Sequence, residues 1–417
     1  MLKGTFRAFV SRNYRLFFIG QTLSLIGTWM QSVAIGWFVY RLTHSDADLG
    51  IVTFAQQIPM LLVSPLAGVA ADRANKRNLL VGTQTLLALQ ALAMAGLALW
   101  GHGDLYPWIL GLAVFMGIVG AFDTPARQSF VVEMVDDRSL LANAIGLNST
   151  MFNLARLVGP VIAGITIKLT NEGTCFFINA LSFIAVIAGL LMMRLPLMVM
   201  KEGARDAWGE FMDGARYVRN HTPIRALLTL LFIMSFVSGF YQVLLTVFAA
   251  QVYKGDSGTL GYLTSAVGAG ALIAAIFLAG RKSVVGLLRW IVIASSMFAV
   301  SLMFFSLTHT FWLGMVALPF LGFGTMMHMG STNTMVQTLV EDSMRGRVMA
   351  FYVMSFVGST PVGSLIAGVL SSRFGPNTTL LVSSVMGLVA ALIFGLTSHR
   401  LRALIRPIYV SKGILET

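Results

Sequence analysis

The sequence has little of what disulfide-bonded, metal-binding or ATP-driven proteins require. It contains a single cysteine, Cys175, among 417 residues, which excludes an internal disulfide and a zinc site built from cysteines. Charged residues make up only 11% of the chain, whereas they make up roughly a quarter of an ordinary soluble domain. No phosphate-binding loop of the Gly-Lys-Ser/Thr type is present, so nothing indicates ATP hydrolysis. We expect neither a bound cofactor nor a resident metal ion.

What the sequence does contain is long apolar runs. Hydrophobic residues account for 56% of the chain, and a run of about 18 or more residues can cross a bilayer as a helix. The runs are continuously apolar, whereas barrel strands alternate. The first run lacks the small-residue cleavage site of a removable signal peptide. We therefore predict an all-α integral membrane protein with twelve transmembrane helices, near residues 14–39, 49–71, 79–100, 107–132, 140–168, 174–194, 223–250, 258–280, 287–307, 311–336, 347–370 and 376–397.

The net charge of +12 indicates membrane orientation rather than a nucleic-acid partner. When successive connections are assigned to alternate sides with the N-terminus inside, most lysines and arginines fall on the cytoplasmic side. Only Arg41, Lys168, Lys254 and Arg373 fall outside, and Arg156 lies within a run. Cytoplasmic connections are the ones enriched in basic residues, so both termini are predicted to be cytoplasmic.

The longest connection divides the chain into two halves that repeat weakly. Val135-Asp136-Asp137 matches Val340-Glu341-Asp342 at an offset of 205 positions. This symmetry is typical of transporters with a central site between two bundles. We predict an N-terminal six-helix bundle over 1–194, a cytoplasmic linker over 195–222 and a C-terminal six-helix bundle over 223–417. Within the linker, apolar residues at helical spacing face charged ones, which predicts an amphipathic helix along the inner membrane surface.

A basic turn between the second and third runs carries the most specific motif. It reads Gly68-Val-Ala-Ala-Asp72-Arg73-Ala-Asn-Lys76-Arg77. The segment resembles the signature loop of the major facilitator superfamily, which implies a transporter with two pseudo-symmetric six-helix bundles. The resemblance also implies an inner gate at the cytoplasmic face, for which the candidates are Gly68, Asp72, Arg73, Lys76, Arg77, Glu133, Glu341, Arg345 and Arg347.

A second motif lies in the fifth run, at Arg156, Gly159, Pro160 and Gly164. Proline bends a helix, and small residues let a neighbouring helix pack closely. The segment resembles the motif of the exporting, proton-antiporting branch of the superfamily, although two of that motif's glycines are alanines here. An ordinary proline kink is the alternative interpretation. Four further segments, Asn13–Phe17, Gly27–Gln31, Phe122–Gln128 and Phe152–Arg156, together resemble the subgroup that contains the enterobactin exporter and the macrolide-efflux proteins.

Ionisable side chains inside the apolar runs are the candidates for coupling, because charge is costly in hydrocarbon. Asp123 is the only acid well inside a run, and the offset of 205 relates it to His328, the only histidine there. Asp123 is either a proton site or a latch paired with Arg127, which lies four positions on, where helical side chains meet. His328 is interpreted as a pocket or proton group, as a packing residue, or as a metal ligand with its neighbouring methionines.

Polar residues of the central runs are candidates for the substrate cavity. Arg156 keeps its charge in proteins, and it is expected to receive an anionic substrate group, to hold Asp123 ionised, or to bond carbonyl groups freed by Pro160. The full set of cavity candidates is Gln31, Asn148, Asn153, Arg156, Tyr241, His328 and Asn333.

These observations predict a secondary active transporter rather than an enzyme. We expect a monomeric exporter in the bacterial inner membrane, in contact with lipid, that uses the proton gradient for antiport of a small, moderately hydrophobic drug or siderophore. The alternatives are a flippase for lysophospholipid or another lipid, and a metal-ion efflux protein.

Overall fold

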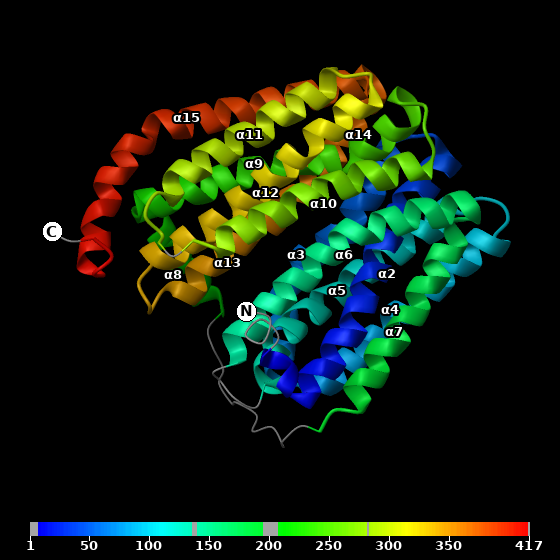
Figure 1. Cartoon of the computed structure of the whole chain (residues 1–417), viewed down its shortest axis with the longest axis horizontal. Coiled ribbons are helices and arrows are strands. Elements are labelled where there is room, and N and C mark those ends of the chain that lie inside the picture. Colours follow the sequence, from blue (N-terminus) through cyan, green and yellow to red (C-terminus); the bar gives the residue numbers. More distant parts are fainter. Residues whose placement is uncertain (1–6, 136–139, 195–206, 282, 416–417) are drawn as a thin grey trace. The chain divides into compact units, whose positions relative to one another are not determined.

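The described part of the chain is helical throughout. The computed structural model describes residues 7–135, 140–194, 207–281 and 283–415, without the side chains of 64–66, 68–73, 142, 207 and 208. No strand occurs among these residues (Figure 1). The predicted all-α class is confirmed. Eleven helices in the described part are long and apolar enough to cross a membrane. Helix α3 (Asp46–Arg73) is of similar length but is not among the eleven, so the total of twelve crossings stays a prediction.

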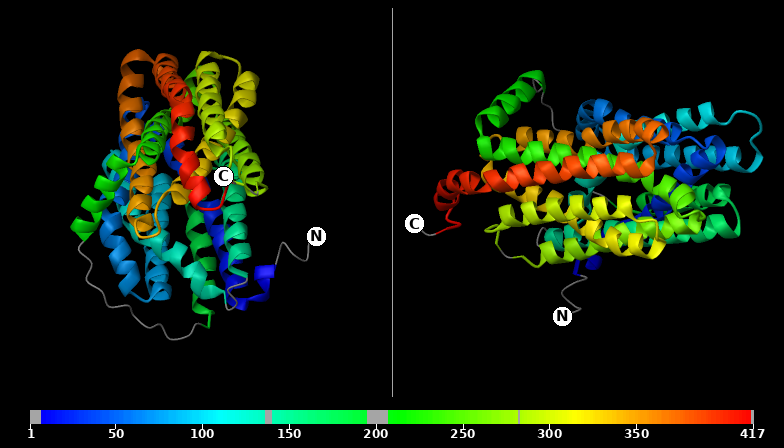
Figure 2. Two further views of the ribbon diagram at one scale, coloured as in Figure 1. Left: turned by 90° about the vertical axis from the view of Figure 1, so that its left-hand side faces the viewer. Right: turned by 90° about the horizontal axis from the view of Figure 1, so that it is seen from above.

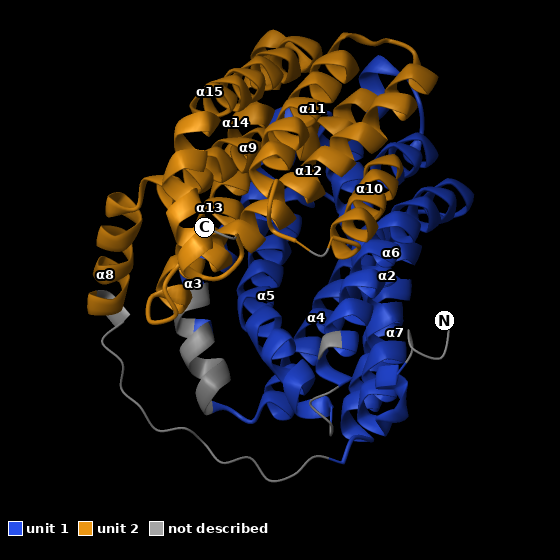
Figure 3. Ribbon diagram, turned by 60° about the vertical axis from the view of Figure 1, so that its left-hand side comes forward, with its two compact units in different colours: residues 1–203, 249–265 blue, residues 204–248, 266–417 orange. Residues whose placement is uncertain are grey.

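Contacts divide the chain into two units, which are coloured separately in Figure 3. Unit 1 comprises Met1–Gly203 and Ala249–Ser265, and unit 2 comprises Ala204–Phe248 and Ala266–Thr417. The helix predicted in the linker is α8 (Ala207–Asn220), and it belongs to unit 2.

In unit 1, α2 packs against α6 and α7, α4 packs against α5 and α7, and α3 packs against α5. Two asparagines fix where helices begin, because Asn75 accepts a hydrogen bond from the Asn78 amide at 3.1 Å and Asn171 accepts one from the Thr174 amide at 3.0 Å. The helices are α2 (Arg12–Thr43), α3, α4 (Lys76–Trp100), α5 (Tyr106–Met134), α6 (Leu141–Leu169) and α7 (Glu172–Leu191), preceded by the 3-10 turn η1 (Arg7–Val10).

In unit 2, α9 packs against α14 and α15, and α11 packs against α12 and α15. Besides α8, the elements are α9 (Thr222–Val247), the π-helical turn η3 (Phe248–Val252), α10 (Ser257–Ala279), α11 (Leu287–Leu307), α12 (Phe311–Leu339), α13 (Arg345–Val357), α14 (Ser359–Phe374) and α15 (Pro376–Ser411). The division between units falls inside η3 and again inside α10.

Two elements of unit 2 differ from the predicted runs. The single run expected at 347–370 is broken at Gly358 into α13 and α14. Pro361 lies three residues beyond the break, and it cannot donate the backbone hydrogen bond that would continue the helix smoothly. Helix α15 continues well past the run that ends at 397, and Pro407 lies inside it. The helix curves toward its C-terminal end (Figures 1 and 2).

The two halves of the broken span are held differently. On the α14 side, Thr360 Oγ1 donates to the Ser235 carbonyl and Ser364 Oγ donates to the Gly239 carbonyl, both at 3.2 Å. A Cβ atom at Gly239 would lie 2.6 Å from the Ser364 nitrogen, so α9 and α14 approach as closely as two backbones can. Helix α13, in contrast, carries α8 on its surface, with Phe211 stacked on Phe351 at 5.0 Å.

Candidate functional site

The buried acid of unit 1 is fully partnered. Asp123 lies in α5 with 1% of its surface exposed. Its Oδ2 is 2.6 Å from Nη2 of Arg127, one helical turn on. Its Oδ1 accepts hydrogen bonds from Thr83 Oγ1 at 2.9 Å and from Gln84 Nε2 at 2.7 Å, both on α4.

The latch interpretation of Asp123 requires a contact with Arg127, and the structure has that contact. One cation and two neutral donors converge on the two carboxyl oxygens of Asp123. The Arg127 side chain is 27% exposed. The sequence analysis missed Thr83 and Gln84, because lone polar residues in an apolar run carry no signal of which neighbour they face.

A second polar network crosses unit 1 among α2, α4 and α7. Gln31 Nε2 donates to Gln90 Oε1 at 2.8 Å, and Asn179 Nδ2 donates to Gln31 Oε1 at 2.6 Å. All three side chains are buried. Gln31, a cavity candidate, therefore ties helices together in this structure.

The antiporter-like motif in α6 makes close helix contacts in unit 1. A Cβ atom at Gly159 would lie 2.6 Å from Cβ of Trp29 on α2, and one at Gly164 would lie 2.7 Å from the Ser257 carbonyl oxygen. Pro160 stands between these two glycines, inside the helix. The glycines thus allow approaches that a larger residue would block.

Arg156 of the same motif contacts an aromatic ring rather than the buried acid. Its guanidinium carbon lies 5.7 Å from the centroid of the Trp29 ring, a cation–π contact. Among the described residues, Arg156 forms no ion pair. The interpretation that Arg156 holds Asp123 ionised is therefore wrong for this structure, in which Arg127 has that position.

Two further cavity candidates, Asn148 and Asn153, are both hydrogen-bonded. Tyr14 Oη donates to Asn148 Oδ1 at 3.1 Å, and Asn153 Nδ2 donates to the Ser149 carbonyl at 2.8 Å. In unit 2, Asn333 accepts from Gln337 Nε2 at 2.6 Å.

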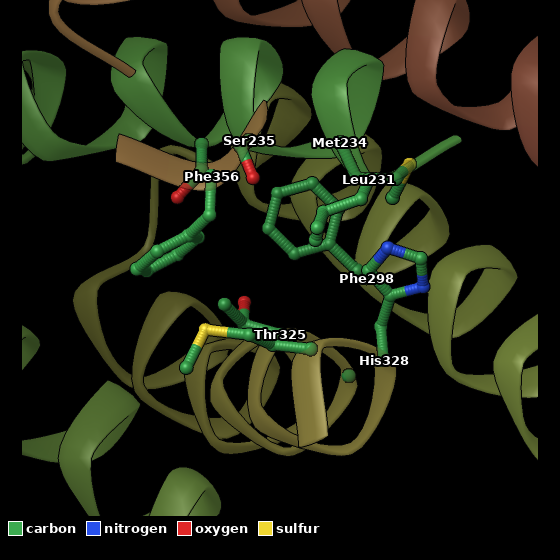
Figure 4. Close-up of a pocket in the computed structure, with 10 residues that line it drawn as sticks. Leu231, Met234, Ser235, Phe298, Thr325, His328 and Phe356 are labelled. Atoms are coloured by element: carbon green, nitrogen blue, oxygen red, sulfur yellow. The ribbon is translucent and has the colours of Figure 1, made fainter. Parts of the chain in front are cut away.

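A small cavity lies beside His328 in unit 2. It holds about 20 Å³, room for about one water molecule. Hydroxyl groups of Ser235, Ser238 and Thr325 contribute its polar lining, and Figure 4 shows His328 and Thr325 on α12 facing α9. The apolar lining consists of Leu231, Met234, Phe298, Met329 and Phe356, with Gly324 completing the wall.

His328 has unused hydrogen-bonding capacity. It is 3% exposed, and neither ring nitrogen has a hydrogen-bond partner among the described residues. Ser331 and Thr332, one turn further along α12, are completely buried, and within the described chain their hydroxyl groups are also unpartnered. His328, Ser331 and Thr332 form an unpartnered stripe along α12. Because buried polar groups almost always find partners, this stripe is suited to binding ordered water or a ligand.

The two methionines directly beside His328 in the sequence point to different surroundings. Met327 packs in an apolar cluster with Ala274 and Ala294, whereas Met329 lines the cavity, so the neighbouring methionines diverge. No group of three or more His, Cys, Asp or Glu residues in the described part of the chain could hold a metal ion. Tyr241 lies close by, edge-on to Phe298 at 6.2 Å.

The inner-gate candidates form separate contacts within each unit. In unit 1, Lys76 pairs with Glu133, and Arg77 Nη2 donates to the Leu191 carbonyl at 2.6 Å. The side chains of Gly68, Asp72 and Arg73 lie outside the described residues.

In unit 2, the remaining inner-gate candidates lie at the start of α13 and just before it, and two of them contact α8. Arg347 Nη1 is 3.4 Å from Asp213 Oδ2, and Arg347 Nη2 is 3.8 Å from Glu210 Oε1. Arg345 pairs with Asp342 at 2.5 Å, and the Glu341 amide donates to Tyr217 Oη at 3.3 Å. The α8 partners were not expected, since the amphipathic helix was predicted to face lipid.

A further ion pair in unit 1 joins the end of α6 to the start of α10. Lys168 Nζ lies 2.9 Å from Asp256 Oδ2. The hydrogen bond from Lys168, with one from the Thr259 amide, lowers the pKa of Asp256 below its usual value. Gln251 Nε2 also donates to Tyr40 Oη at 2.7 Å, so the segment Ala249–Ser265 is held to unit 1 by polar contacts.

The chain resembles membrane transporters over nearly its whole length. The model of the transmembrane secretion effector family matches residues 3–404. The staphyloferrin A transporter of Staphylococcus aureus is 25% identical, with 93% of this chain and 97% of that protein covered. The multidrug efflux pump Tap of Mycobacterium tuberculosis is also 25% identical, with 92% and 91% covered. A solved bacterial homologue of the human lysosomal transporter Spinster matches with a TM-score of 0.74 at 15% identity, over 94% of this chain and 97% of that one, which shows the fold alone.

Proposed function

Since the chain belongs to the transmembrane secretion effector family of the major facilitator superfamily, we propose that it exports a small, moderately hydrophobic molecule by proton-coupled antiport. Members of such a family are multi-pass transporters of small molecules, not enzymes. Two of the similar proteins are named for a siderophore and for multiple drugs, so we propose a substrate of the drug or siderophore type.

The unpartnered stripe of α12 is the observation that carries the proposal. His328, Ser331 and Thr332 offer buried donors and acceptors. His328 lines the small cavity, whose other lining is mostly aliphatic and aromatic but includes Ser235, Ser238 and Thr325. Ligand sites typically combine a mostly apolar wall with a few polar groups. A molecule that is mainly hydrophobic, with one or two hydrogen-bonding groups, would match this lining once the cavity widens.

We assign the coupling role to the Asp123–Arg127 pair. Protonation of Asp123 would release Arg127, so the latch and proton-site interpretations describe two states of one device. Thr83 and Gln84 would hold the carboxyl group in place in both states, since a neutral carboxyl oxygen still accepts hydrogen bonds. The proton gradient is then the energy source, without a cofactor.

The orientation and the inner gate complete the proposal. We place the protein in the bacterial inner membrane with both termini in the cytoplasm, and we expect a monomer. Asp72 and Arg73 would form part of the inner gate. Asp72→Asn should then reduce transport while folding is largely retained, and wild-type transport in a reconstituted assay would refute the gating role.

Transport by reconstituted protein tests the function directly. Proteoliposomes loaded with a panel of fluorescent drugs and siderophores would be given a pH gradient of either sign. We expect accumulation of at least one compound against its gradient, driven only when protons flow in the opposite direction. His328→Asn should change the apparent affinity for that compound, whereas His309→Asn, at an exposed loop position, should not. Transport that does not depend on the pH gradient would overturn the antiport proposal.

A further inference from the structure

A second and larger cavity of unit 2 lies away from His328. It holds about 390 Å³ and is lined at one end of α11, α12 and α15 by Val285, Gly286, Leu288, Arg289, Met335, Arg402, Ile405, Arg406, Tyr409 and Leu415. Figures 1 and 2 show α15 running beside α11 and ending in the C-terminal turns from which four of these residues come. The volume is within the lower range of ligand sites.

The polar lining of this cavity is positively charged. Three of its ten residues are arginines, Arg289, Arg402 and Arg406, and none is acidic. Within the described chain, no ion pair is formed by any of these three. Helix α11 begins here at Gly286 without a side-chain cap, and the N-terminal end of a helix favours anions.

Tyr409 adds a hydrogen-bond donor to the cavity. The residue is 6% exposed and lines the cavity. Its Oη makes no hydrogen bond with any residue that the structure describes, and the oxygen atom is accessible rather than buried. The hydroxyl group can therefore donate to an anion bound in the cavity.

The remaining lining is apolar and lies where a membrane helix meets basic sequence. Leu288, Met335 and Ile405 are buried beneath the arginines. The apolar run of α15 ends near residue 397, and Arg400, Arg402 and Arg406 follow. Basic pockets between membrane helices at such a boundary suit the headgroups of acidic lipids.

We propose that this cavity binds an acidic phospholipid. The phosphodiester group would lie among Arg289, Arg402 and Arg406, with Tyr409 donating a hydrogen bond, and the start of an acyl chain would lie against Leu288 and Ile405. A free phosphate ion shares the anionic chemistry but would leave the apolar lining uncovered. The inference is independent of the transported substrate.

Lipid binding to the purified full-length protein tests the proposal. Phosphatidylglycerol, phosphatidylcholine or inorganic phosphate would be titrated into protein in a neutral detergent, with retained lipid counted by native mass spectrometry and the melting temperature recorded. We expect phosphatidylglycerol to bind more tightly than phosphatidylcholine and to raise the melting temperature more. Each of Arg402→Gln and Arg406→Gln should weaken phosphatidylglycerol binding about fivefold, and the double variant about thirtyfold.

Arg400→Gln is the matched control, because Arg400 is exposed on the same helix but does not line the cavity. It should leave phosphatidylglycerol binding within twofold of the parent. Three results would each overturn the proposal. The first is equal binding of the two lipids, and the second is a loss of phosphatidylglycerol binding in Arg400→Gln as large as that in the cavity variants. The third is stabilisation by inorganic phosphate that matches stabilisation by the lipid. The last of these results would assign the cavity to a soluble anion.

Discussion

Replacement of Asp123 by asparagine distinguishes two roles of this residue, a structural latch for Arg127 and a proton carrier alone. Asparagine keeps an oxygen that can accept from Thr83 and Gln84, but its amide group would face the Arg127 guanidinium, donor against donor. Breaking a buried ion pair by removing one partner costs about 3–5 kcal/mol. Because Arg127 is 27% exposed, water screens part of its unpaired charge, so we expect a loss of about 2–3 kcal/mol.

The assay is a double-mutant cycle in purified protein. Asp123→Asn should lower the melting temperature by about 2–4 °C, and Arg127→Gln should lower it at least as much, because it leaves the more deeply buried Asp123 without its cation. The double variant should recover part of the loss, because a glutamine oxygen can accept from the asparagine amide. A coupling free energy of about 2 kcal/mol is expected for residues in direct contact.

A matched control is the exposed pair Arg345–Asp342, at which the two side chains are 50% and 86% exposed. Asp342→Asn should leave the melting temperature nearly unchanged. If Asp123→Asn is as stable as the parent and loses only uphill export, with substrate binding retained, the latch is refuted and Asp123 is a proton carrier alone.

Three further predictions concern other parts of the molecule. His328→Asn should change the pH dependence of transport, whereas the control His309→Asn should not. If the pH dependence of transport is unchanged in His328→Asn, His328 has only a packing role. Gly159→Leu should abolish transport or folding, because α2 leaves no room for its side chain, whereas Gly146→Leu on the same helix, where no heavy atom lies within 4 Å, should be tolerated; equal yields would contradict this packing argument. The lowered pKa of Asp256 means that its ion pair stabilises the fold above the ordinary value of 3.8 and is lost as the pH falls through the lowered pKa. The melting temperatures of the parent and Asp256→Asn should therefore differ slightly at pH 7 and converge only as the pH falls below 3.8 and through the lowered pKa.

The sequence predicted the helices well, because continuous apolar runs leave few alternatives in a bilayer. The all-α class and the family resemblance are both confirmed. The contact of Asp123 with Arg127 follows from helix periodicity alone. Local pattern could not predict which residues approach from other helices, such as Thr83 beside Asp123 or the α8 acids beside Arg347, since such pairings are set by tertiary packing. The break at Gly358 did have a local signal, since Ser359, Thr360 and Pro361 follow it, but the long apolar run on either side outweighed that signal.

That break divides one membrane span into two helices with different neighbours. Helix α14 is fastened to α9 through Thr360, Ser364 and Gly239. Helix α13 packs on α8 as well as on α9, and it carries Phe356 of the His328 cavity. A displacement of α8 would therefore be passed through α13 to Phe356, whereas Ser235 would stay with α9 and α14.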